Sequence, residues 1–158
     1  MGKKELSHIN EAGNAHMVDV SSKDSSTRTA IASGKVVFPK DVFETLASQD
    51  FLGPKGSIIQ TSIIAGIQAV KKTSDLIPLC HQLNLSKVHI DIYPSGSSLH
   101  ITCKVKCTER TGVEMEALTG VAVSALTIYD MCKALSHNIV ISNIQLEQKT
   151  GGKHDFNR

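Results

Sequence analysis

Residues 85–107 read LSKVHIDIYPSGSSLHITCKVKC, and this stretch decides the fold class. Two runs of alternating apolar and polar side chains, 85–93 and 99–107, flank the turn sequence PSGSS. Alternation with a period of two is typical of strands that bury one face, so the stretch predicts a β-hairpin. Cys103 and Cys107 fall on the apolar face of the second run, and we expect both to be buried free thiols.

Before the hairpin, the sequence predicts one strand and two helices. The strand begins near Thr29, and Pro39 then stands at the favoured first position of a short helix over 39–48. Ser57 is a candidate N-cap for a second helix, whose apolar residues recur at helical spacing. Asp75 and the following Pro78 end that helix.

After the hairpin, Thr119 is a candidate cap for a third helix that runs to about Leu135, and residues 139–148 form the last strand. Without the short helix, the order is β-α-β-β-α-β. The elements therefore predict an α+β protein of ferredoxin-like type. Its antiparallel four-stranded sheet carries helices on one face, with one extra helix.

Composition excludes several classes of protein. The 158 residues fit a single domain, with a polar N-terminal arm over 1–28 and a polar tail over 149–158. A net charge of +2 and an aromatic content of 4% do not indicate a protein that binds nucleic acid. No apolar run is long enough to cross a membrane, and the N-terminus lacks a signal peptide. We expect a cytoplasmic protein that binds neither nucleic acid nor membrane.

Three short segments hold the residues that could carry chemistry. They read SDLIPLCH (74–81), TGVEME (111–116) and LTIYDMCK (126–133). Together they supply His, two Glu, Asp and Lys from three separate elements. This mixture predicts that the segments converge on one site. No pair of cysteines has the spacing of a zinc site, so we expect no metal.

Two pairs of charged residues have open interpretations. Asp130 and Lys133 are three apart on a helix and share a face, either as a surface ion pair or as an acid/base pair with shifted pKa values. If 111–116 is a strand, Glu114 and Glu116 point to the same side. They then form either a solvated sheet edge or a pair that shares a proton or a cation.

Three isolated residues complete the candidates. We interpret His81, in the loop after Pro78, as a ligand-binding or proton-transfer group rather than the base of a Cys80 nucleophile. Lys55 lies between glycines, in a loop that suits contact with a phosphate or a developing charge. Arg28 can form a bidentate phosphate contact. The alternative for Lys55 is an ordinary solvated lysine.

Four blocks of sequence, 8–21, 64–88, 111–135 and 151–156, closely resemble the molybdenum cofactor biosynthesis protein C family, the cyclic pyranopterin monophosphate synthases. The motifs DLIPLCH, GVEMEALT and LTIYDMCKA carry the resemblance. It implies a ferredoxin-like lyase without a cofactor. The implied substrate is purine-derived, 3′,8-cyclo-7,8-dihydroguanosine 5′-triphosphate, and the products are cyclic pyranopterin monophosphate and pyrophosphate.

The resemblance also implies roles for individual residues. Asp130 and Lys133 would be the catalytic pair, with Lys55 as a third catalytic group. The substrate-binding residues would be Leu79, Cys80, His81, Glu114, Met115, Glu116 and Arg28. The implied assembly is a homohexamer, a trimer of dimers with active sites at the dimer interface. We also expect the Lys55 loop and the Asp130–Lys133 helix to come from different chains of the dimer.

Two other functions compete with this prediction. One is a ferredoxin-like module that binds a small molecule without turnover, which would not need Asp130 together with Lys133. The other is a hydrolase of purine nucleotides in which Glu114 and Glu116 hold a metal ion, so that a chelator would abolish its activity.

Overall fold

A computed structural model describes residues 8–158, and its main elements follow the predicted order. The strands and helices are β1 (Ser26–Val37), α1 (Lys40–Ser48), β2 (Leu52–Gly53), β3 (Gly56–Ser57), α2 (Ile58–Lys71), α3 (Thr73–Leu76), β4 (Leu85–Ser95), β5 (Ser98–Glu109), α4 (Glu114–Cys132), β6 (Val140–Thr150) and β7 (Phe156–Asn157). Among residues 8–158, no helix is long and apolar enough to cross a membrane.

One antiparallel sheet joins the strands in the order β4-β5-β1-β6-β7. Four long strands appear as predicted, but β7 adds a short fifth strand, in which Asn157 pairs with Gln148. The tail that we expected over 149–158 is therefore partly built into the sheet. The arm is also shorter than expected, because residues 26–28 already belong to β1. Residues 1–7 of that predicted arm lie outside the described part.

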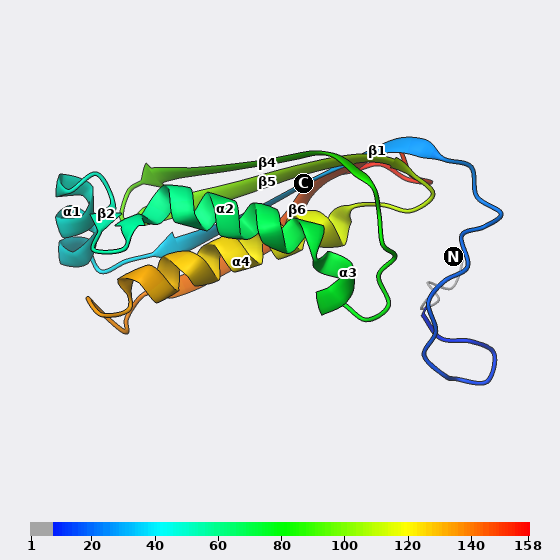
Figure 1. The fold of residues 1–158 in the computed structure, drawn as a ribbon, viewed down its shortest axis with the longest axis horizontal. Helices are drawn as coiled ribbons and strands as arrows, with labels where there is room; N and C mark the ends of the chain where they lie inside the picture. The colour runs from blue at the N-terminus through cyan, green and yellow to red at the C-terminus, as the bar shows by residue number, and fades with distance from the viewer. Residues whose placement is uncertain (1–7) are drawn as a thin grey trace.

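Helices α2 and α4 lie side by side along one face of the sheet, as predicted (Figure 1). Helix α1 lies at one end of the molecule, and residues 8–25 extend from the opposite end. The sheet turns its apolar face toward the helices. On β5, every second side chain is fully buried, as the alternation predicts: Leu99, Ile101, Cys103, Val105 and Cys107. Both cysteines of that strand are free thiols, which confirms the prediction.

Small residues let α2 and α4 approach closely. A Cβ atom on Gly66 would lie 2.1 Å from Ser124 Oγ and 2.9 Å from the carbonyl oxygen of Gly120. The Ser124 hydroxyl donates a hydrogen bond of 3.0 Å to the carbonyl of Ser62. The two helices are therefore fixed to each other by direct backbone contact as well as by apolar packing.

The start of α4 differs from the prediction. The helix begins at Glu114, so Thr119 lies inside it and is not its cap. The neighbours Glu116 and Ala117 are both buried, and so are Gly120 and Val121 one turn later, a pattern that a helix produces and an alternating strand does not. Glu114 and Glu116 stand in the first turn, where the helix dipole favours negative charge. The prediction that Glu114 and Glu116 lie on one face of a strand is therefore wrong.

The second helix begins as predicted and ends earlier. The Ser57 hydroxyl accepts a hydrogen bond from the backbone N–H of Gln60, which confirms the cap. Helix α2 ends at Lys71, and the separate one-turn helix α3 follows before Pro78. The predicted loop before Ser57 contains a small hairpin, β2–β3, in which Gly53 pairs with Gly56.

Candidate functional site

The C-terminal end of α4 carries the Asp130–Lys133 pair. Lys133 Nζ lies 2.6 Å from Asp130 Oδ1, and both side chains are more than half exposed. The hydrogen bond and charge of Lys133 hold the pKa of Asp130 below its usual range, and Asp130 raises the pKa of Lys133. Both groups are therefore ionised at neutral pH and accessible to a ligand.

Lys55 lies at the same end of the molecule, in the turn between β2 and β3. Gly56 follows it with a φ of 102°, a left-handed conformation that favours glycine. The positive charge of Lys55 adds to the effects that lower the pKa of Asp130. Lys55, Asp130 and Lys133 line one cavity of about 450 Å³, whose other walls are largely apolar: Leu46, Leu52, Ile58, Met131 and Leu135.

We expected the Lys55 loop and the Asp130–Lys133 helix to come from different chains of a dimer. Within a single chain, the hairpin β2–β3 already brings Lys55 to the cavity at the end of α4. This arrangement favours a half-site in which all three residues belong to one chain.

The N-terminal end of α4 carries the second group of predicted residues. A cavity of about 280 Å³ is lined by Cys80, His81, Leu83, Thr111, Gly112, Glu114, Met115 and Glu116. Leu79 precedes Cys80 in the same loop and is half-buried, but it does not line this cavity. The structure therefore gathers most of the predicted substrate-binding residues in one place.

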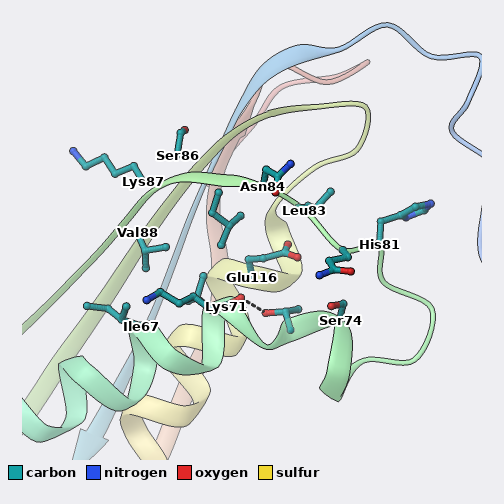
Figure 2. A pocket seen from close by; sticks show the side chains of 14 residues that line it. Ile67, Lys71, Ser74, His81, Leu83, Asn84, Ser86, Lys87, Val88 and Glu116 are labelled. Carbon is teal, nitrogen blue, oxygen red and sulfur yellow. Dashed lines mark hydrogen bonds between the residues drawn. The ribbon is translucent and has the colours of Figure 1, made fainter.

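Glu116 is the most perturbed acid of the site. Its side chain is buried, and in Figure 2 it points toward the loop that carries Leu83 and His81. Burial, with a smaller effect from the charge of Glu114, raises the pKa of Glu116 to about 7. A carboxyl group with this pKa can both hold and release a proton at neutral pH, as general acid/base chemistry requires. Burial, and then the charge of Glu116, also raise the pKa of Cys80.

His81 is oriented by the N-terminal arm. Its Nε2 atom lies 2.8 Å from the carbonyl oxygen of Val18. A carbonyl only accepts hydrogen bonds, so Nε2 carries the hydrogen and Nδ1 is left for a ligand. The sequence alone gave no sign that residues near Val18 would contact this loop.

Arg28 and Glu114 line a third cavity, of about 200 Å³, next to the second one. Arg28 Nε donates to the carbonyl of Glu109 at 3.0 Å, and its Nη2 donates to the carbonyl of Arg110 at 3.2 Å. Lys149 Nζ lies 3.0 Å from Glu114 Oε1. Lys149 was missed in the sequence because it lies outside the three segments that could carry chemistry, and only the pairing of β6 with β1 brings it here.

The two ends of α4 hold different halves of the predicted site. Fourteen residues separate Glu116 from Asp130, which corresponds to about 21 Å along a helix. Within one chain, the His81–Glu116 group therefore does not meet the Lys55–Asp130–Lys133 group. Among residues 8–158, no three His, Cys, Asp or Glu side chains gather in the manner of a metal site.

Comparison with known proteins agrees with the resemblance seen in the sequence. Residues 17–152 match the model of the MoaC family. A Streptomyces coelicolor relative, named cyclic pyranopterin monophosphate synthase, is 52% identical over 148 residues, which cover 94% of this chain and 86% of the relative. A Xanthomonas campestris pv. campestris (strain B100) protein of the same name is 48% identical over 152 residues, covering 96% of this chain and 92% of that protein.

A plant protein matches the same part of the chain. The Arabidopsis thaliana protein named cyclic pyranopterin monophosphate synthase, mitochondrial, is 52% identical over 151 residues, which cover 94% of this chain and 55% of the plant protein. The family model and these relatives all span nearly the whole described fold, including both ends of α4. The chain belongs to the MoaC family.

Proposed function

We propose that this chain is a single-domain cyclic pyranopterin monophosphate synthase, a phosphorus–oxygen lyase of molybdenum cofactor biosynthesis. It converts 3′,8-cyclo-7,8-dihydroguanosine 5′-triphosphate to cyclic pyranopterin monophosphate and releases pyrophosphate. Near-full-length relatives with that name support the proposal. The observation that carries it is the pair of clusters at the two ends of α4. One is cationic with an ionised Asp130, and the other contains a carboxyl group whose pKa is about 7.

We also propose that the fold is of the ferredoxin-like type. Strands β1, β4, β5 and β6 with helices α2 and α4 follow the order β-α-β-β-α-β along the chain. This order and the antiparallel sheet β4-β5-β1-β6 support a ferredoxin-like core, to which α1 and β7 are additions.

We infer that the complete site forms between two copies of the chain. A two-fold axis across antiparallel α4 helices brings the C-terminal end of one helix to the N-terminal end of the other. The 21 Å between the half-sites of one chain is then spanned by the partner. Ile64 on α2 and Leu126 on α4 are 59% and 58% exposed, and such apolar surface favours association. A homohexamer, as a trimer of dimers, completes this proposal.

Each half of the composite site has a separate task. Rearranging a purine ring into a pterin requires several proton transfers, for which Glu116, His81 and Asp130 offer groups of different acidity. Expelling pyrophosphate develops negative charge, which Lys55 and Lys133 can stabilise. No step requires a bound cofactor. The thiols of Cys103 and Cys132 are buried, which raises their pKa values to about 12 and 11, so neither is a ready nucleophile at neutral pH.

The direct test is incubation with the cyclised guanosine triphosphate, followed by assays for pyrophosphate and for the pterin. Asp130→Asn should lower kcat by roughly 10²–10⁴-fold, as loss of a general acid or base does. Lys133→Met should lower kcat by roughly 10²–10³-fold, as loss of a group that stabilises developing charge does. Lys40→Met is the matched control, because Lys40 also forms an exposed ion pair on a helix, with Glu44. It should leave kcat unchanged, and all variants should keep the wild-type circular dichroism.

Three results would contradict the proposal. Substrate binding without turnover would favour the binding module. Hydrolysis that a chelator abolishes would favour the hydrolase. Full activity of either α4 variant would remove that residue from the mechanism.

A further inference from the structure

Two residues at the start of α4 are shared by two neighbouring cavities. Gly112 and Glu114 line both the cavity of about 200 Å³ that contains Arg28 and the cavity of about 280 Å³ that contains His81. Among the described residues, no other lines both of these cavities. Gly112 and Glu114 therefore form the wall between them, and the position of the Glu114 side chain shapes each cavity.

The carboxylate of Glu114 lies directly against the backbone of Gly112. A Cβ atom on Gly112 would overlap Glu114 Oε2, and it would lie 2.7 Å from Cδ and 2.9 Å from Oε1 of the same side chain. Real Cβ atoms do not approach other heavy atoms to less than 3.0 Å. The carboxylate can therefore occupy this position only because residue 112 has no side chain.

Close approach, and not backbone conformation, is the reason for a glycine here. Gly112 is not among the glycines of the described chain that have a left-handed φ, so an alanine can adopt its φ. The three atoms nearest to the added Cβ all belong to the end of one flexible side chain, that of Glu114. We therefore expect an alanine at residue 112 to be compatible with the fold and to displace the Glu114 carboxylate.

The carboxylate acts on both cavities from this position. Lys149 Nζ on β6 lies 3.0 Å from Glu114 Oε1, so Glu114 neutralises a cation of the smaller cavity. In the other cavity, burial is the main cause of the raised pKa of Glu116, and the negative charge of Glu114 adds to it. A displaced carboxylate would therefore release Lys149 and change the charge that faces Glu116.

We propose that Gly112 is a positioning residue of the synthase site that acts through Glu114. Because it lacks a side chain, the Glu114 carboxylate can lie in the wall between the two cavities and pair with Lys149. The inference rests on the proposed function, in which Glu114 is one of the substrate-binding residues. A methyl group at residue 112 would take the place of the carboxylate and remove it from the position in which it contacts the substrate.

A double-mutant cycle tests this role by steady-state kinetics with the cyclised guanosine triphosphate. Gly112→Ala should raise KM about ten-fold, as loss of a charge-assisted contact does, and should change kcat less than KM. Glu114→Ala should raise KM at least as much. The Glu114→Ala chain has no carboxylate to displace, so adding Gly112→Ala to it should change KM less than about two-fold.

Gly96→Ala is the matched control. Gly96 lies in the turn between β4 and β5 with a φ of 60°, and a Cβ atom there would have no heavy atom within 4 Å. An alanine is strained at this φ, so the variant should lose stability without any collision. Its KM and kcat should equal those of the wild type, which separates the effect of lost stability from that of a displaced carboxylate.

A crystal structure of the Gly112→Ala variant provides a readout that does not depend on activity. It should show the Glu114 carboxylate beyond hydrogen-bonding distance of Lys149 Nζ, with α4 still beginning at Glu114. A carboxylate that remains paired with Lys149 would overturn the inference.

The kinetic results can also overturn it. Additive increases of KM in the cycle would show that Gly112 acts independently of Glu114, and an equal effect of Gly96→Ala would show that only stability matters. A wild-type protein without synthase activity would refute the proposed function, while a displaced carboxylate in the crystal structure would still show that Gly112 places Glu114. Synthase activity in the wild type with an unchanged KM in Gly112→Ala would refute the inference and retain the function.

Discussion

Mixed dimers of inactive variants provide a sharp test of how the two half-sites are combined. Each proposed active site takes the Lys55–Asp130–Lys133 end from one chain and the His81–Glu116 end from its partner. Consider chains with Lys133→Met mixed with chains with His81→Ala. In a mixed dimer, one site contains both lesions, and the other contains neither.

The expected recovery follows from symmetry. Random pairing makes about half of the dimers mixed, and each has one intact site of two, so activity should reach about a quarter of the wild-type value. The matched control mixes Lys55→Met with Lys133→Met chains. Both residues line the same cavity of one chain, so every site of a mixed dimer carries one lesion. This mixture should regain no activity.

The assay is pyrophosphate release after the two chains are unfolded together and refolded, with mass spectrometry to verify that mixed dimers form. Recovery in the Lys55/Lys133 mixture, or none in the His81/Lys133 mixture, would refute the composite arrangement. The first result would also show that the hairpin β2–β3 serves the partner's site rather than its own.

Two further predictions concern buried polar groups. The Ser62 hydroxyl is buried without a hydrogen-bond partner among the described residues, so Ser62→Ala should leave stability unchanged or raise it by up to about 1 kcal/mol. Ser124→Ala loses a hydrogen bond and should cost about 1 kcal/mol, a difference that denaturant titration resolves; equal losses in both variants would contradict the assignment. The pKa of Glu116 is raised from 4.5 to about 7, so its contribution to stability is complete below about pH 4.5 and is lost as the pH rises through 7. Glu116→Gln should therefore match the wild type near pH 4.5 and be up to about 3 kcal/mol more stable at pH 8, and an equal difference at both pH values would refute this.

The sequence predicted those parts of the fold in which local pattern and burial agree. The alternation over 85–107 placed the hairpin correctly, because one face of each strand is buried against helices. Ser57 was recognised as a cap because its hydroxyl acts within the same turn. The start of α4 was predicted wrongly, because the local alternation of residue types and the burial disagree there. The letters Glu-Met-Glu alternate like a strand, and the burial of the neighbours Glu116 and Ala117 together identifies the helix.

The candidate site was predicted in composition but not in arrangement. The motifs identified Asp130, Lys133 and Glu116, since each lies in a specific local pattern. Their division between two ends of one helix depends on where α4 begins, which the sequence did not reveal. Lys149 was out of reach because its neighbour Glu114 is 35 residues away, and the contact depends on strand pairing.

The close contact between α2 and α4 has a consequence for how two active sites would communicate. In the proposed dimer, each site is formed by one end from each α4 helix, so both helices serve both sites. Gly66 packs directly against Ser124, where an added Cβ atom would lie 2.1 Å from the serine Oγ, so α2 and α4 are packed as one unit. A substrate that changed the spacing of the α4 helices at one site would therefore change their spacing, and with it the substrate affinity, at the other.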